Sequence, residues 1–523
     1  MKKIILLLVF IFIHHFTEAQ QISWLQSDTM GYNSNPQFPL HKLAVTNQGV
    51  VVAKLSASHQ LFGSDILGDY TVASLDSTGA LLWSVDLSGK VLVTALAVDG
   101  AEDIYLGGEY METMLINGTD SLTNTSSGFD QNYFLMSFSP QGVLRWKKNL
   151  SLTNNDIQQI TTLEKDANGF MWYVYQHLLS FSHEIIQLDN IGNELLTYTT
   201  TRTRLCNSIS FDAANNLYLA GATESGTINI NGLSETVPES YMMFVSRINN
   251  FGQTSWIRFG IDITFQTPQV VALPNGDAIL GGNNFDSTSW GNLVFPDNFF
   301  GTNFFLTRVD SNANFLWGYG LPLNDTGYYS VGSGHFFDVD ASDNIYVTGT
   351  IQGTIHFTPT LVVNSGLPAT YNLGILKLDG SGQVVSLKLG GAMNSNYPQD
   401  LRVSGIGKGY VQATIGGEAI FDSLTTGLAG SLSAALIHFD DNNSTTGVRS
   451  VEDVSFIAYP NPFSDRLVLD GFRGEVKVEI LDVLGCLVHE QFATKGEIKL
   501  PALTREIYFL RIDNKLIRLV KAE

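Results

Sequence analysis

Charged side chains are scarce in this sequence, and positive charge is scarcest. Only 15% of the residues are Asp, Glu, Lys or Arg, and 29 Lys and Arg stand against 50 Asp and Glu, which gives a formal net charge of −21. Nucleic acid and anionic membrane surfaces are bound through Lys and Arg, so neither is an expected partner. Residues 457–523 hold ten basic and ten acidic side chains, so the whole excess falls on residues 1–456 and the composition changes near residue 456.

Cysteines are also few, and the sequence has no apolar run long enough to cross a membrane. The two cysteines, Cys206 and Cys486, lie on opposite sides of that change, which excludes a disulfide framework. The apolar run of residues 4–13 would span about 15 Å as a helix, roughly half a hydrocarbon core, so we expect no membrane span. Lys2 and Lys3 before this run and small residues around Ala19 after it predict a signal peptide over residues 1–19, and therefore passage through the periplasm.

What the sequence does contain is glycine, 49 residues, and 11% aromatic side chains, a balance typical of many short strands joined by tight turns. One motif, Asp/Asn-x-x-Gly-x-x-x-Trp, recurs after alternating apolar strands and predicts a hairpin whose Trp points into a core. Its copies and near matches begin at Asp76, Ser139, Asp189, Asn249, Asp310 and Asp379, and the expected core tryptophans are Trp83, Trp146, Trp256 and Trp317, with Trp24 as a spare near the N-terminus.

Two further elements complete the repeat. A second turn with a following strand is clearest at Asp340–Gly349 and Asp212–Gly221, and a Gly-x-apolar-x-apolar element lies between the turns, as at Gly226–Ile230. Together they predict about four strands per unit and seven units. Because the last unit lacks a Trp strand while residues 22–24 offer one, we expect a ring closed by pairing the two ends. The sequence thus predicts an all-β, repeat-built β-propeller of about seven four-stranded blades over residues 20–440, with six or eight blades as alternatives.

Residues 21–440 resemble the bacterial β-propeller repeats known as SBBP-type repeats. The resemblance implies a fold and no activity, because propellers serve many functions.

The C-terminal segment carries a more specific pattern. Tyr459-Pro460-Asn461-Pro462-Phe463 is followed by short alternating apolar runs, by the expected hairpin turn from Asp482 to Gly485, and by a strand containing Tyr508 before the closing Lys521. These residues predict a small Ig-like β-sandwich over residues 457–523, after a linker over residues 441–456.

This segment resembles the C-terminal sorting domain of the type IX secretion system of the Bacteroidetes. The resemblance implies recognition by the outer-membrane translocation machinery and export to the cell surface or the medium, usually with removal of the domain. Thr504-Arg505-Glu506 stands where the family commonly has a Gly before the Tyr strand.

Patterns that carry chemistry are few. The sequence contains no His-Glu-x-x-His, no Gly-x-Ser-x-Gly and no phosphate-binding loop, so we predict no catalytic, cofactor or metal residues and no cofactor. Residues 338–344 could form a calcium loop, but their spacing favours a turn. His335 and His356 are interpreted as surface or edge histidines. The aromatic run of residues 295–305 could be a binding surface, but strand packing explains it equally well.

Three functions remain open. A non-catalytic binding or adhesion module with a glycan or protein ligand fits the regular repeats. A secreted enzyme acting on polysaccharide or peptide is the first alternative, because acidic residues from separate blades can converge without a linear motif. A structural surface or matrix protein is the second.

Overall fold

The chain divides into two compact units, residues 1–444 and 445–523, in the computed structural model described below. The structure describes residues 21–29, 41–61, 65–124, 132–150, 158–261, 268–284, 287–296, 303–321, 327–332, 334–364, 372–392, 396–421, 424–426, 432–441, 457–459, 463–470, 476–481, 487–493, 496–501, 503–504, 507–512 and 515–521. The predicted signal peptide and linker lie outside these residues.

Antiparallel strands make up the first unit, and the described residues include no α-helix. The largest sheet has the order β2-β3-β4-β5-β6-β8-β9, with β7 paired to β6. Its strands are β2 (Lys42–Val45), β3 (Gly49–Leu61), β4 (Asp65–Asp76), β5 (Leu81–Val98), β6 (Ile104–Ile116), β7 (Asp120–Thr123), β8 (Asn132–Phe138) and β9 (Leu144–Leu150). The long β5 joins two groups of four, because its first half pairs mainly with β4 and its second half with β6.

The next two sheets repeat one plan, four strands in chain order plus a hairpin. One comprises β10 (Gln158–Lys165), β11 (Met171–His177), β12 (Ser182–Leu188), β13 (Glu194–Thr201), β16 (Thr227–Ile230) and β17 (Leu233–Thr236). The other comprises β14 (Thr203–Phe211), β15 (Leu217–Thr223), β18 (Met243–Ile248), β19 (Thr254–Ile261), β22 (Thr288–Trp290) and β23 (Leu293–Phe295). Each hairpin comes from the following repeat in the sequence and pairs with the last strand of the preceding group.

Two further sheets of the first unit are built around the same group of four strands. One comprises β20 (Gln269–Ala272), β21 (Ala278–Asn284), β24 (Asn303–Val309) and β25 (Phe315–Gly320). Another comprises β26 (Tyr328–Val331), β27 (Phe337–Val339), β28 (Ile345–Gln352), β31 (Asn372–Leu378), β32 (Val384–Ala392), β35 (Ala419–Phe421) and β36 (Leu424–Thr426), and a separate hairpin comprises β29 (Thr354–His356) and β30 (Val362–Asn364).

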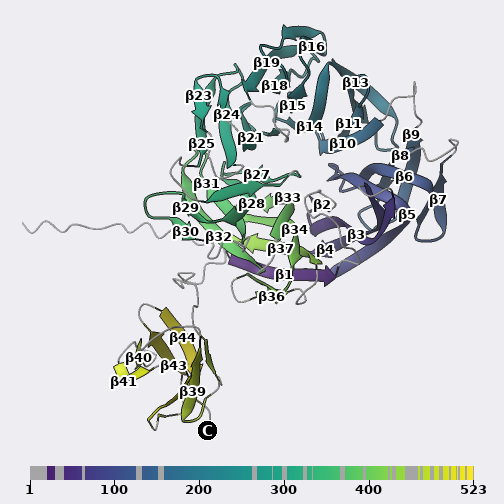
Figure 1. Cartoon of the computed structure of the whole chain (residues 1–523). Helices are drawn as coiled ribbons and strands as arrows, with labels where there is room; N and C mark the ends of the chain where they lie inside the picture. Colours follow the sequence, from purple (N-terminus) through teal and green to yellow (C-terminus); the bar gives the residue numbers. More distant parts are fainter. Residues whose placement is uncertain are drawn as a thin grey trace, which may run out of the picture. The chain divides into compact units, whose positions relative to one another are not determined.

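The last sheet joins the two ends of the unit. Its strands are β33 (Asn396–Gly405), β34 (Lys408–Gly416), β37 (Leu432–Asp440) and β1 (Gln21–Thr29). β1 pairs antiparallel with β37, from Gln21 opposite Asp440 to Thr29 opposite Ser433. Figure 1 shows β1 beside β37, with the other sheets following one another around the unit.

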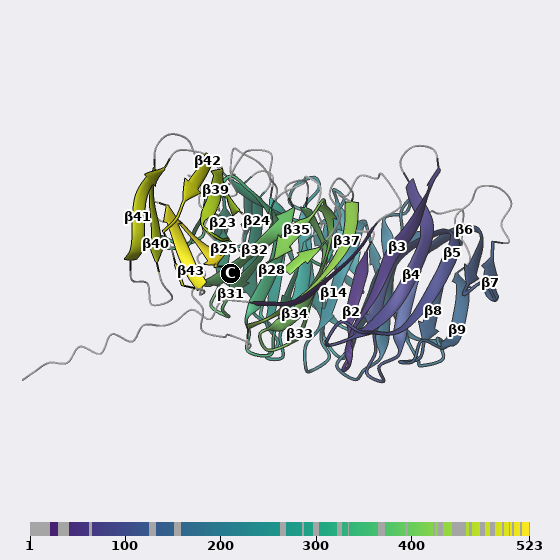
Figure 2. The ribbon, with the colours of Figure 1, turned by 90° about the horizontal axis from the view of Figure 1, so that it is seen from below.

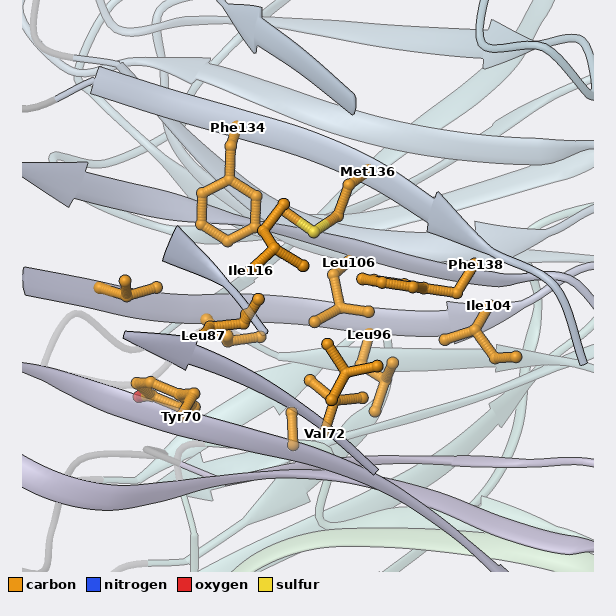
Figure 3. Packing of buried hydrophobic residues seen from close by; sticks show 14 of the residues in the cluster. Tyr70, Val72, Leu87, Leu96, Ile104, Leu106, Ile116, Phe134, Met136 and Phe138 are labelled. Atoms are coloured by element: carbon orange, nitrogen blue, oxygen red, sulfur yellow. The ribbon is translucent and has the colours of Figure 1, made fainter. Parts of the chain in front are cut away.

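Apolar side chains from successive sheets fill the spaces between them. Figure 3 shows one such cluster, in which Tyr70 from β4, Leu96 from β5, Leu106 from β6 and Phe134 from β8 point into a shared layer. All four side chains are buried. In Figure 2 the strands of neighbouring sheets in this unit stand side by side, which lets each sheet bury one face against the next.

The Asp-x-x-Gly turns have the predicted backbone geometry. Gly79 N–H donates to Asp76 O, and Asp76 N–H donates to Ala80 O, both at 2.9 Å. The Asp76 carboxylate accepts from the backbone N–H groups of Thr78 and Ala80. Gly79 has a φ of 86°, which L-residues with a Cβ rarely adopt.

The second unit is a pair of antiparallel sheets. One has the order β38-β39-β42 and the other β41-β40-β43-β44. Their strands are β38 (Ile457–Tyr459), β39 (Arg466–Asp470), β40 (Val476–Leu481), β41 (Leu487–Ala493), β42 (Gly496–Lys499), β43 (Ile507–Ile512) and β44 (Lys515–Val520). Leu467 from the first sheet and Ile480 and Leu510 from the second share one buried cluster.

Candidate functional site

Four of the predicted core tryptophans link neighbouring groups of four strands. The indole N–H of Trp83, on β5, donates to Pro140 O at 2.8 Å, in the Ser139–Gly142 turn that joins β8 to β9. The same contact recurs from Trp146 to Asn190 O, from Trp256 to Ser311 O and from Trp317 to Gly380 O. Trp256 is buried and the other three are half-buried. Each of the four therefore contacts the hairpin turn of the next group of four strands.

One link in this series was missed by the sequence motif. The copy beginning at Asp189 has Leu196 in place of Trp, and Leu196 is exposed. Tyr198, two residues later on β13, fills the place instead: a Cβ added to Gly252 would lie 3.2 Å from its ring. Tyr198 also stacks on Trp172, with 5.4 Å between ring centroids. Trp24 lies on β1 opposite His438, and its side chain lies outside the part that the structure describes.

A cluster of ionisable side chains lies on the first strands of several sheets. Arg402, on β33, is the central member: its guanidinium lies 3.7 Å from the Glu164 carboxylate on β10 and 3.6 Å from that of Asp400. Asp400 also accepts a hydrogen bond from Leu43 N–H, on β2, at 3.0 Å. Three sheets distant in the sequence therefore meet through one guanidinium and one carboxylate.

Two further groups complete this interior cluster. The imidazole Nδ1 of His335 lies 2.8 Å from Leu401 O, and its Nε2 lies 3.3 Å from the Arg402 guanidinium. Asp338, on β27, accepts from Val403 N–H at 2.9 Å. The structure thus corrects the interpretation of His335 as a surface or edge histidine, because contacts from β33 hold it inside the unit. His356 is exposed, as predicted.

Burial shifts the proton affinity of these groups. It raises the pKa of Asp400 to about 6, although the positive charges of Arg402 and Lys42 oppose the shift. It likewise raises the pKa of Glu164 and lowers that of His335 well below its usual value. Carboxylates with raised pKa values are candidates for proton transfer in an enzyme, but they also mark buried structural ion pairs.

The contacts of the cluster favour a structural interpretation. The carboxylates of Asp400 and Asp338 accept backbone N–H groups of neighbouring sheets, and Arg402 lies among the acidic groups. Within the described part of the chain, no group of three or more His, Cys, Asp or Glu is arranged to hold a metal ion. The cluster can therefore join the sheets at their inner edges.

The other candidate residues from the sequence lie in packed strands or in turns. Phe304 and Phe305 are fully buried on β24, so within the aromatic run they pack the core; residues 297–302 lie outside the described residues. The Asp340 carboxylate accepts from Ser342 N–H and Asn344 N–H and closes the turn before β28, as predicted. Cys206 is a buried free thiol.

The two ends of the sorting motif meet in the second unit. Phe463 forms a parallel bridge with Lys521, whose ammonium lies 5.9 Å from the centre of the Phe463 ring. Phe463 itself is fully buried. A cation placed over an aromatic face is favoured electrostatically. The contact therefore ties the start of this unit to its last described residue.

Tyr508 is held where the sequence departs from the family pattern. Its hydroxyl donates to Thr504 O at 3.1 Å and lies 2.8 Å from Thr504 Oγ1, so Thr504 anchors the Tyr strand. Tyr459 ends β38. The other predicted motif residues lie outside the described residues: Pro460, Asn461, Pro462, Asp482 and Gly485.

The second unit is a sorting domain of a secretion system. Residues 457–522 match the family model described as the secretion system C-terminal sorting domain. The chain therefore carries a type IX sorting signal, which supports its export to the cell surface or the medium. Among the described residues we find no apolar helix of membrane-spanning length.

Comparisons with whole proteins add little. No curated protein matches the chain. Solved structures with some likeness are a protein of unknown function from Bacteroides caccae (11% identity, 61% of this chain and 89% of that chain, TM-score 0.32) and PorZ, a surface component of the type-IX secretion system of Porphyromonas gingivalis (10%, 95% and 100%, TM-score 0.18). A third is the quinohemoprotein alcohol dehydrogenase of Comamonas testosteroni (10%, 86% and 79%, TM-score 0.35). TM-scores this low support no inference about function, and the resemblance of residues 21–440 to SBBP-type repeats stays a prediction.

Proposed function

We propose that this protein is cargo of the type IX secretion system, and that its first unit is a closed seven-bladed β-propeller serving as a non-catalytic binding or adhesion module. The sorting domain carries the first part of the proposal. In the second unit, Phe463 and Lys521 bring the two ends of the motif together.

The sheet orders support the closed ring. Counting the eight-stranded sheet as two groups that share β5, and β1 as a member of the last group, the first unit has seven groups of four neighbouring strands. The last group takes β1 as its fourth strand, from the opposite end of the unit. Closure of this kind removes the two exposed sheet edges that an open array would leave.

Engineered cysteines test the closure. Ser27 and Ala435 are opposite each other on β1 and β37, so Ser27→Cys with Ala435→Cys should form a disulfide under mild oxidation. Gln26→Cys with Ala435→Cys is the matched control, because neighbouring residues of a strand point to opposite faces. A mass lower by two hydrogens in the first variant alone supports the ring; equal cross-linking in both, or none in either, contradicts it.

The contacts of the interior cluster favour binding over catalysis, because its carboxylates are engaged by Arg402 and by backbone N–H groups of neighbouring sheets. A secreted polysaccharide- or peptide-degrading enzyme remains the alternative that the raised pKa of Asp400 favours. Asp400→Asn together with Glu164→Gln separates the two, because hydrolysis that depends on these carboxylates should disappear while ligand binding on the outer loops stays unchanged.

Deletion of residues 457–523 tests the export. In the native producer, full-length protein should appear at the surface or in the medium, and the truncated protein should remain in the periplasm. The measurement is intact mass in each fraction. Equal export of the truncated protein would show that the tail does not direct this chain.

A further inference from the structure

Strained backbone, aromatic rings and arginines coincide at one place on the first unit. Several described residues other than glycine have a positive φ. Three of them are bulky: Phe181, Arg202 and Tyr241, with φ values of 50°, 58° and 59°. Bulky L-residues rarely adopt this conformation, which costs about 1–3 kcal/mol each and persists only where the surroundings enforce it. Such residues cluster at ligand-binding sites.

Backbone hydrogen bonds bring the connections that carry Phe181 and Arg202 together. Phe181 ends the turn between β11 and β12, and its carbonyl accepts from Thr203 N–H at 3.0 Å. Arg202 lies between β13 and β14, and its carbonyl accepts from Glu224 N–H at 3.1 Å. Tyr241 precedes β18. The connections therefore belong to two neighbouring sheets and meet at their common end.

Arg204 links the last member to the others. Its guanidinium lies 5.7 Å from the centre of the Tyr241 ring and 3.8 Å from the Glu224 carboxylate. The Arg202 guanidinium donates to Ser225 O at 2.6 Å. These contacts orient both guanidiniums while leaving most of their five N–H donors for other partners. We call Phe181, Arg202, Arg204 and Tyr241 the Arg–aromatic patch.

The patch is exposed, and its composition is that of a recognition surface. The exposed fractions are 38% for Phe181, 44% for Tyr241 and 55% for the Arg204 side chain. Aromatic residues and Arg are enriched where binding energy concentrates. In a first unit with strong excess negative charge, two adjacent exposed arginines also favour an anionic ligand.

We propose that the Arg–aromatic patch binds an acidic polysaccharide, with sugar carboxylates on Arg202 and Arg204 and sugar rings against Tyr241 and Phe181. This inference rests on the proposed role of the unit as a binding module. Guanidiniums pair with carboxylates through two parallel hydrogen bonds. The patch is built from turns and strand ends, which offer a peptide no free strand edge to extend, so a saccharide suits it better than an acidic peptide.

The test measures binding of the full chain to immobilised polygalacturonate by biolayer interferometry. Methyl-esterified polygalacturonate has the same backbone without the charges and should bind at least about tenfold more weakly. Poly-glutamate carries the charges on a peptide and should also bind at least about tenfold more weakly. Arg202→Gln and Arg204→Gln should each weaken binding about tenfold or more, the loss typical of a central binding residue. Arg258→Gln, which changes an exposed arginine on β19, should leave binding unchanged.

Glycine variants separate binding from structure. Phe181→Gly and Tyr241→Gly remove the rings and relax the positive φ, so binding should fall at least about fivefold while the melting temperature stays equal or rises. A purely structural role predicts a lower melting temperature instead.

Different outcomes test the saccharide site and the proposed role of the first unit as a non-catalytic binding module. Absence of binding to polygalacturonate, binding that survives both arginine changes, or tighter binding to poly-glutamate each overturns the saccharide site. Release of new reducing ends from polygalacturonate refutes the non-catalytic role of the unit, whereas the arginine variants still decide whether the patch holds the polymer.

Discussion

The contact between Trp83 and Gly142 gives a sharp test of how neighbouring groups of four strands are held together. A Cβ added to Gly142 would lie 2.5 Å from the Trp83 ring, and the φ of Gly142 is 77°. Gly142→Ala should therefore cost about 1–2 kcal/mol for the left-handed backbone. Displacing Trp83 from Pro140 O should cost about 1–2 kcal/mol more in lost hydrogen bonding and packing.

Gly118 provides the matched control. Its φ is 65°, and an added Cβ would meet nothing within 4 Å, so Gly118→Ala should cost only the backbone part, about 1–2 kcal/mol. The difference between the two variants then isolates the contact with Trp83. In a Trp83→Leu background the two glycine changes should cost nearly the same, which gives a coupling of about 1–2 kcal/mol.

Urea unfolding followed by circular dichroism measures these free energies. The midpoint should fall further for Gly142→Ala than for Gly118→Ala, with an unchanged dependence on urea. If the two variants lie within about 0.5 kcal/mol of each other, or if Trp83→Leu leaves the difference intact, the tryptophan does not secure the neighbouring turn and the argument fails.

Three further outcomes follow from single side chains. Burial lowers the pKa of His183 to about 3, below its value of 6.5 in the unfolded chain, so the protein loses stability as the pH falls below 6.5 and the unfolded chain takes up the proton. His183→Asn should therefore reduce the change in the free energy of unfolding between pH 7.5 and 5.5 by about 1.4 kcal/mol, measured by urea unfolding at both pH values. Asp400 acts in the opposite direction, because burial raises its pKa to about 6 and protonation therefore favours the folded state. The effect of Asp400→Asn on the free energy of unfolding should be more favourable at pH 7.5 than at pH 5.5, and an equal effect at both pH values contradicts the raised pKa. Tyr508→Phe removes the hydroxyl held by Thr504 and should destabilise the second unit by about 1–2 kcal/mol, seen by calorimetry as a lower transition temperature for that unit alone.

Local turn chemistry explains why the strands could be predicted from the sequence. Asp76 and Gly79 specify one hairpin through two backbone bonds and a positive φ, and such requirements leave a readable pattern. The pairing of β1 with β37 was also predictable, because the missing strand of the last repeat had a counterpart at the N-terminus. Both predictions depend on residues close together in the sequence or on a simple count of strands.

The sequence could not predict which sheet the third repeat element, Gly-x-apolar-x-apolar, would join. The apolar residues of Gly226–Ile230 indicated a strand, but the same alternation suits pairing within its own group or with a neighbour. The structure pairs β16 with β13 of the preceding sheet, where Ile228 and Ile230 are fully buried. The element therefore adds a strand to another group and is not one of the four strands of its own.

Neither the interior cluster nor the Arg–aromatic patch could be predicted from a sequence motif, and the reason is the same for both. Arg402 meets Glu164 across 238 positions of sequence, and Arg204 meets Tyr241 through a connection that includes a whole hairpin. In the proposed ring, equivalent positions of distant repeats lie at the same edge, so chemistry there is encoded by repeat position and not by local spacing. The residues that break the repeat pattern at such positions are therefore the ones to examine for function. Arg202 and Arg204 are two of them: they stand at the start of a first strand, in a unit whose other charged residues are mostly acidic.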